Sequence, residues 1–109
     1  MFRRFLAVLL TFAAILAAGW LALRRPDIPF ETLEAVYAAP ESRFITWEPD
    51  VSVHYRDEGN RDGPALVLVH GYGASLHTWE PWVRRLGDEF RIISLDLPGH
   101  GLTRTTNTE

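Results

Sequence analysis

Two continuous apolar segments, each ending in a glycine-rich turn, constrain the fold of this chain more than any other feature. The first, Ala65–Val69, runs into His70-Gly71-Tyr72-Gly73. The second, Phe90–Leu95, runs into Asp96-Leu97-Pro98-Gly99-His100-Gly101. Strands without polar alternation are typical of sheets that helices cover on both faces. The pattern therefore predicts a βαβ unit whose two turns lie at the carboxyl ends of neighbouring parallel strands.

The residues between these two segments have the spacing of a helix. Over residues 75–86 the apolar positions recur every three or four residues: Leu76, Trp79, Trp82, Val83 and Leu86. Pro81 falls early in this helix, where its missing N–H costs least, and Gly87 ends it. We expect Trp79, Trp82 and Leu86 to form a stripe buried against the sheet.

Residues 44–58 follow a different pattern, in which apolar and polar side chains alternate. The segments 44–47 and 51–55 flank a Pro49-Asp50 turn and predict an antiparallel hairpin. In this alternation His54 falls on the polar side, so we expect it to point outward. A polar turn over residues 58–64 then leads into the first apolar strand.

The amino-terminal quarter of the 109-residue chain does not belong to this unit. Phe5–Leu23 is an uncharged apolar run of about 19 residues, close to the ~20 that span a bilayer. It has arginine pairs on both sides, and we interpret residues 1–25 as a single-pass transmembrane anchor. A signal peptide cleaved near Ala17-Ala18-Gly19 is the alternative. Residues 26–43 would be a linker with a short helix over residues 31–39, and residues 44–109 a folded domain, with a weak preference for the non-cytoplasmic side.

Composition excludes several classes of function. The net charge of −3 gives no reason to expect a nucleic acid partner. The chain has no cysteine, which rules out disulfides and thiolate metal sites. The four histidines lack the spacing of a zinc site, and Gly71-x-Gly73 lacks the third glycine of a dinucleotide fingerprint. We therefore expect neither a metal nor a cofactor.

The two motifs together resemble the α/β-hydrolase superfamily, in its esterase, epoxide-hydrolase and carbon–carbon-hydrolase branch. The resemblance covers about residues 44–103 and includes the strand Val53-His54-Tyr55-Arg56 followed by Gly59, and Trp79 on the next helix. It implies an α/β fold in which a hairpin precedes the βαβ unit and the strands lie in the order 1-2-4-3. This chain would be the amino-terminal part of that fold, preceded by one transmembrane helix.

The resemblance also implies an oxyanion hole. In this family one backbone N–H comes from the loop after the third strand and another from the residue after the nucleophile. By position the loop donor is the backbone N–H of Tyr72. Structural roles are implied for the other motif residues, in which the histidine begins its turn and the aspartate braces the next loop: His70, Gly71, Gly73, Asp96, Pro98, Gly99 and Gly101. His100 is interpreted in the same way as His70.

No Gly-x-Ser-x-Gly motif is present, so nucleophile, acid and base are expected beyond Glu109, in a protein of which this chain is an incomplete record. Gly73 stands where many epoxide hydrolases and dehalogenases have proline, which favours a serine enzyme acting on small esters or related acyl compounds. An enzyme with an aspartate nucleophile and a non-catalytic binding protein are the alternatives. The third strand would be an open apolar edge, so we expect the fragment alone to be inactive and poorly soluble.

Overall fold

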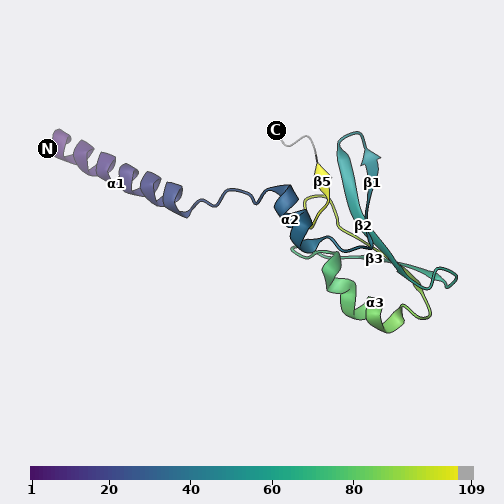
Figure 1. Ribbon diagram of the computed structural model, residues 1–109. Helices are drawn as coiled ribbons and strands as arrows, with labels where there is room; N and C mark the ends of the chain where they lie inside the picture. The colour runs from purple at the N-terminus through teal and green to yellow at the C-terminus, as the bar shows by residue number, and fades with distance from the viewer. Residues whose placement is uncertain (106–109) are drawn as a thin grey trace.

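The computed structural model describes residues 1–105, and Figure 1 shows a long helix separated by a linker from a small α/β unit. The elements follow in the order α1 (Phe2–Leu23), α2 (Phe30–Tyr37), β1 (Ser42–Glu48), β2 (Val51–Gly59), β3 (Ala65–Val69), the 3₁₀ helix η1 (Leu76–Trp79), α3 (Glu80–Leu86), β4 (Arg91–Leu95) and β5 (Arg104–Thr105).

The sheet has the strand order β1-β2-β4-β3. β1 and β2 form an antiparallel hairpin, β2 pairs antiparallel with β4, and β3 pairs parallel with β4. The predicted hairpin, the parallel pair and the strand order are thereby confirmed. Within residues 1–105 the only strand that pairs with β3 is β4, so β3 lies at an edge. The two-residue strand β5 pairs with β2 and was not predicted, because two polar residues carry no periodicity.

The crossover between β3 and β4 is two short helices instead of the single predicted one. η1 ends at Trp79, and α3 begins at Glu80 with Pro81 in its first turn. A 3₁₀ helix has 3.0 residues per turn instead of 3.6, which changes the phase of the side chains along the segment. Leu76, at the start of η1, is 1% exposed, while Trp82, in α3, is 54% exposed. The prediction that Trp82 belongs to a stripe buried on the sheet is wrong.

The two faces of the sheet have different environments. On the face covered by α2, η1 and α3, the buried residues are largely polar: His54, Arg56 and Ser94 lie there together with Ile92. The opposite face holds an open apolar depression of about 680 Å³. Its lining residues come from β1, β2, β4 and the segment after β4: Ile45, Trp47, Glu48, Val51, Val53, Tyr55, Ile93, Leu95, Leu97 and Pro98. The helices of the described chain cover only one face.

α2 is fastened to the covered face by polar contacts at both of its ends. Arg104 pairs with Glu34 at 2.6 Å and lies over the ring of Phe30. At the other end the carbonyl oxygen of Tyr37 accepts a hydrogen bond of 3.2 Å from Arg56. These contacts make α2 part of the α/β unit, while the linker before it is extended (Figure 1).

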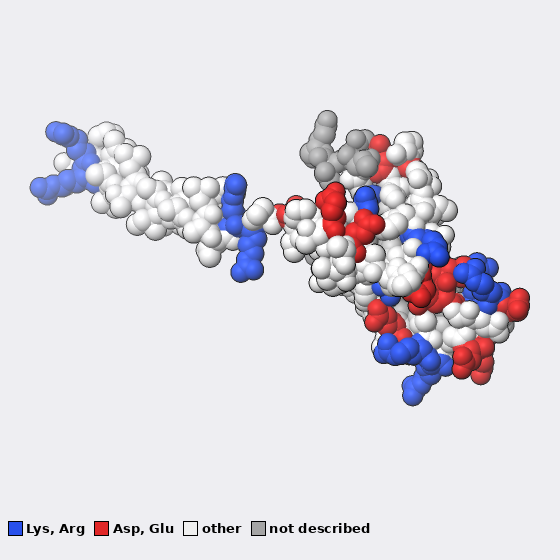
Figure 2. All heavy atoms as spheres, viewed as in Figure 1, with Lys and Arg blue, Asp and Glu red and all other residues white. Residues whose placement is uncertain are grey.

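α1 stands apart from this unit, and none of its residues is buried. Its 22 residues have a mean hydropathy of 2.4 over the most apolar window, enough by length and composition to cross a membrane. Figure 2 shows positive charge gathered at its two ends and an uncharged surface between them. Helices of this kind serve either as membrane anchors or as signal sequences.

Candidate functional site

The two glycine-rich loops lie side by side, because β3 and β4 are parallel neighbours and their carboxyl ends meet at one edge of the sheet. The loop after β3 covers residues 70–75 and the loop after β4 covers residues 96–103. All the residues that the sequence marked as a site fall on these two loops. Their hydrogen bonds define the geometry of this edge.

His70 lies at the start of the first loop and is 4% exposed. Its Nδ1 lies 2.8 Å from the carbonyl oxygen of Gly71, and its Nε2 accepts a hydrogen bond of 3.0 Å from the backbone N–H of Leu97. The carbonyl can only accept, so Nδ1 carries the proton and the ring is neutral. His70 thus joins the two loops and has no ring nitrogen free to act as a base.

Asp96 is fully buried at the end of β4 and connects three parts of the chain. Its carboxylate accepts hydrogen bonds from the backbone N–H of Leu76 at 2.8 Å, the backbone N–H of Leu102 at 2.9 Å and the Nδ1 of His54 at 2.7 Å. Burial alone raises the pKa of Asp96. The three hydrogen bonds outweigh burial, so the net effect is a pKa below the ordinary value.

Positive backbone φ angles at the glycines shape both loops. Gly73 has φ +69°, Gly99 has φ +79° and Gly101 has φ +53°, a region that side chains other than glycine adopt at a cost. Gly101 is also held close to Asp96, because a Cβ at this position would fall on the Asp96 carboxyl group. Pro98 is exposed at the tip of the second loop.

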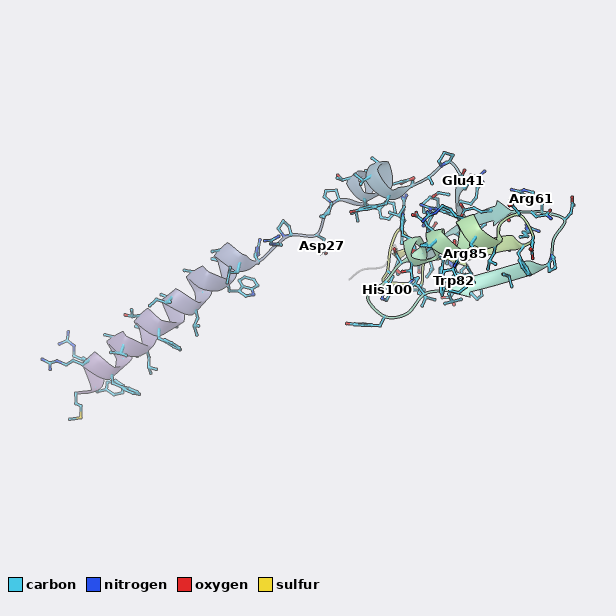
Figure 3. All side chains as sticks on the ribbon, turned by 90° about the horizontal axis from the view of Figure 1, so that it is seen from below. Asp27, Glu41, Arg61, Trp82, Arg85 and His100 are labelled. Atoms are coloured by element: carbon cyan, nitrogen blue, oxygen red, sulfur yellow. The ribbon has the colours of Figure 1, made fainter. Side chains whose placement is uncertain are left out.

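His100, labelled in Figure 3, connects the second loop back to the first through a hydrogen bond. Its Nε2 accepts a hydrogen bond of 3.3 Å from the backbone N–H of Gly73, and its Nδ1 lies 3.2 Å from the carbonyl oxygen of Pro98. Its ring lies 5.1 Å from that of His70 and 6.1 Å from that of Tyr72, centroid to centroid. The first loop is thus held at His70, Gly73 and Leu76.

Tyr72 lies between these fixed points. Its side chain is fully exposed, and its backbone N–H has no hydrogen-bond partner within residues 1–105. Gly71 beside it has no atom within 4 Å of the position of a Cβ, so the backbone is open to the surroundings. A free N–H on a loop held on both sides is the kind of donor that an oxyanion hole requires.

An apolar cavity of about 390 Å³ lies between α2 and these loops. Its lining residues come from α2 and from both loops or their ends: Leu33, Tyr37, Ser75, His77, Gly101 and Leu102. It is large enough for a small organic group. Within the described range 1–105 no three His, Cys, Asp or Glu side chains are grouped as metal ligands.

The role of His54 does not follow from the sequence pattern. It is 0% exposed, so the prediction that it points outward is wrong. The alternation of β2 was identified correctly, but its polar side faces α2 and η1 and is buried there. Two further buried residues were not identified as part of the site. Thr103 donates to the carbonyl oxygen of Asp96 at 2.6 Å, and Arg56 contacts Glu80 and His77.

The chain is similar to a family model, to curated proteins and to solved structures. A family model described as the alpha/beta hydrolase fold matches residues 64–109. The magnesium-chelatase 30 kDa subunit of Rhodobacter capsulatus is 48% identical over 50 residues, covering 46% of this chain and 18% of that protein. The pimeloyl-[acyl-carrier protein] methyl ester esterase of Nitrosomonas europaea is 42% identical over 53 residues, covering 49% of this chain and 20% of that protein.

Among solved structures, the Cif epoxide hydrolase from Acinetobacter nosocomialis matches with a TM-score of 0.57 and 30% identity. The match covers 76% of this chain and 29% of that one. The chain thus spans about a fifth of the length of these curated relatives and under a third of this structure.

Proposed function

Because the chain belongs to the α/β-hydrolase superfamily, we propose that it is the amino-terminal part of a serine-dependent hydrolase of esters or related acyl compounds. Its contribution to catalysis is one donor of the oxyanion hole, the backbone N–H of Tyr72. The nucleophile, the acid and the base lie in the part of the full-length protein that follows Glu109, in the chain order typical of this fold.

The observation that carries the proposal is the N–H of Tyr72, which has no hydrogen-bond partner among residues 1–105, on a loop held at His70, Gly73 and Leu76. When a nucleophile attacks an acyl carbonyl, the oxygen becomes negatively charged. A preorganised N–H lowers that barrier because it needs no rearrangement as the charge develops. Losing one such donor in a comparable enzyme costs about 2.7–4 kcal/mol, or a factor of 10²–10³ in kcat.

The test compares two substitutions at one position in the full-length protein. Tyr72→Pro removes the N–H, and we expect kcat on a p-nitrophenyl acyl ester to fall about 10²–10³-fold. Tyr72→Ala keeps the N–H and removes only an exposed side chain, so kcat should stay within about threefold of wild type. Equal kcat values for both variants, with equal circular dichroism spectra, would show that Tyr72 is not the donor.

The choice of serine is supported by Gly73 and by the likeness to an esterase. The structural likeness to an epoxide hydrolase favours the second candidate, an enzyme with an aspartate nucleophile. A fluorophosphonate probe distinguishes the two, because it modifies activated serines. We expect stoichiometric labelling of the full-length protein and no turnover of an epoxide substrate.

The second alternative is a non-catalytic binding protein, and one relative, from Rhodobacter capsulatus, carries the name of a chelatase subunit and not that of a hydrolase. A protein of this kind would bind a ligand in the same loops without turning it over. Absence of both probe labelling and ester turnover in the folded full-length protein would favour this reading.

For α1 we propose an uncleaved membrane anchor, with the α/β unit on the non-cytoplasmic side. The apolar helix continues through Leu23 and ends at Arg24 and Arg25, as a span ends at the headgroups. The full-length protein should stay in the membrane fraction after an alkaline carbonate wash and keep Met1 by intact mass. A mature protein that begins after Gly19 would identify a signal peptide instead.

A further inference from the structure

A chain of hydrogen bonds, buried over its second half, runs from the segment after α2 to Leu76, directly after the loop that carries Tyr72. The backbone N–H of Ala39 donates to the Oγ of Ser42 at 3.0 Å, and this Oγ lies 2.8 Å from the Nε2 of His54. The Nδ1 of His54 lies 2.7 Å from Asp96, whose carboxylate accepts the N–H of Leu76. His54 and Asp96 are both completely buried.

The chemistry of the carboxylate fixes one proton of this hydrogen-bond chain, on the Nδ1 of His54. Asp96 has a lowered pKa and is a carboxylate, which can only accept hydrogen bonds. The Nδ1 of His54 therefore carries a proton and donates it. Its Nε2 lies 2.8 Å from the Oγ of Ser42, a hydroxyl that can either donate a hydrogen bond to a ring nitrogen or accept one from it. Each of the side chains in this hydrogen-bond chain, Ser42, His54 and Asp96, thus has a hydrogen-bond partner.

We propose that His54 is a positioning residue for the oxyanion loop, acting through Asp96. This proposal rests on the proposed function, in which Tyr72 supplies an oxyanion donor. The rotation of the Asp96 carboxylate decides where the N–H of Leu76 is held, and Leu76 follows the loop of Tyr72. The hydrogen bond from His54 is charge-assisted and comes from β2, which pairs with both β1 and β4 and is rigid for that reason.

The loop after β3 is held by two sets of contacts, one through His70 and His100 and one through Asp96. An effect of His54 on the position of this loop can therefore be distinguished from an effect on folding. His70 and His100 hold the loop to residues 97–100 without any contact with His54. Loss of the hydrogen bond from His54 therefore loosens the Leu76 end of this loop and the contact of Leu102 with Asp96, while the contacts of His70 and His100 stay. The result expected is a folded protein whose oxyanion donor is displaced, and a displacement of about 1 Å can cost 10²-fold in rate.

Ser42, His54 and Asp96 are hydrogen-bonded in the order serine, histidine, aspartate, as in a catalytic triad. Their surroundings do not favour this role. The Oγ of Ser42 already accepts the N–H of Ala39, and Asp96 accepts two backbone N–H groups besides the histidine. Ser42 is the first residue of β1, far along the chain from the glycine-rich loops. Modification of Ser42 by a fluorophosphonate probe would overturn the positioning role.

Two substitutions of similar polarity separate the two nitrogen atoms of the ring. The side-chain amide of His54→Asn reaches about the position of Nδ1 and preserves the donor to Asp96. That of His54→Gln reaches about the position of Nε2 and preserves only the contact with Ser42. Both are made in the full-length protein, with Ser52→Ala on the same strand as a control.

For His54→Asn we expect kcat within about threefold of wild type, and for His54→Gln a fall of about 10- to 100-fold with KM nearly unchanged. A purely structural role would lower the melting temperature of both variants and leave kcat per folded molecule unchanged. That pattern, or a lower kcat for the asparagine variant than for the glutamine variant, would overturn the proposal.

Hydrogen–deuterium exchange gives a readout that does not depend on activity. In His54→Gln the amides of residues 71–76 should exchange about tenfold faster, while those of β4 keep their rates. If His54→Gln does not fold, Ser42→Ala is the milder variant, and the same loop should exchange about twofold faster in it. Unchanged exchange in the loop refutes the positioning role. If the wild-type protein has no ester turnover and His54→Gln still shows this exchange pattern, only the proposed function is refuted.

Discussion

Replacing Gly101 by alanine tests the packing of the site most directly. Gly101 has φ +53°, and a Cβ at this position would fall on the carboxyl group of Asp96. The substitution therefore strains the backbone and displaces a buried carboxylate that holds two loops. Its effect should be much larger than that of an ordinary glycine-to-alanine change.

The magnitude has two parts. A residue other than glycine with a left-handed backbone costs about 1–2 kcal/mol. Displacing Asp96 from one of its hydrogen bonds costs about 1.5–3 kcal/mol, because the acceptor is charged. We therefore expect Gly101→Ala to destabilise the full-length protein by about 3–5 kcal/mol, a large part of the ~5–15 kcal/mol typical of a domain.

Gly99→Ala is the matched control. Gly99 has φ +79° on the same loop, but no atom lies within 4 Å of the position of its Cβ. It should cost about 1–2 kcal/mol from the backbone alone. The measurement is the midpoint of urea denaturation, which should fall about 1 M further for Gly101→Ala than for Gly99→Ala, given an m-value of about 2 kcal/mol/M. Equal midpoints for the two variants would refute this account of the Asp96 site.

Three further outcomes follow from the structure. Because the pKa of Asp96 is lowered in the folded protein, its ionised carboxylate stabilises the folded state fully above about pH 4, and this stabilisation is lost as the pH falls through the folded-state pKa. Acid unfolding monitored by fluorescence should therefore be less steep in Asp96→Asn. Residues 27–109 expressed alone should be insoluble or molten, since Val67 is 60% exposed on an edge strand, and a cooperative melting transition of a monomer would contradict this. Arg104→Ala should free α2 at a cost of about 1 kcal/mol, seen as faster proteolysis before Ser42, whereas cleavage at the wild-type rate would show that the contacts with Glu34 and Phe30 do not hold it.

The sequence predicted the arrangement of the strands better than the environment of their side chains. Continuous and alternating apolar patterns distinguish β3 and β4 from the hairpin, so the order of the strands followed from the pattern together with the resemblance. Burial of His54 did not follow, because alternation separates the two sides of a strand without saying what covers them. Trp82 was misplaced because helical spacing groups the apolar positions of a segment without showing which of them another element covers.

The partners of Asp96 show a different limit of sequence reasoning. His54, Leu76 and Leu102 are separated from it by 42, 20 and 6 positions along the chain. Two of these partners are backbone N–H groups, which every residue except proline has. Since no particular residue type is required for such a donor, only the folded structure identifies these N–H groups as hydrogen-bond donors to the carboxylate.

The strand order β1-β2-β4-β3 also dictates the sequence of events during synthesis. The hairpin can close as soon as β2 leaves the ribosome, but β3 has to wait for β4, which is its only pairing strand within residues 1–105. Val69 emerges about 26 residues before Leu95. At about 5–20 residues per second this leaves an apolar segment unpaired for about 1–5 s. Within the α/β unit, Ala65–Val69 is therefore the strand that stays unpaired longest and has the greatest need of a chaperone.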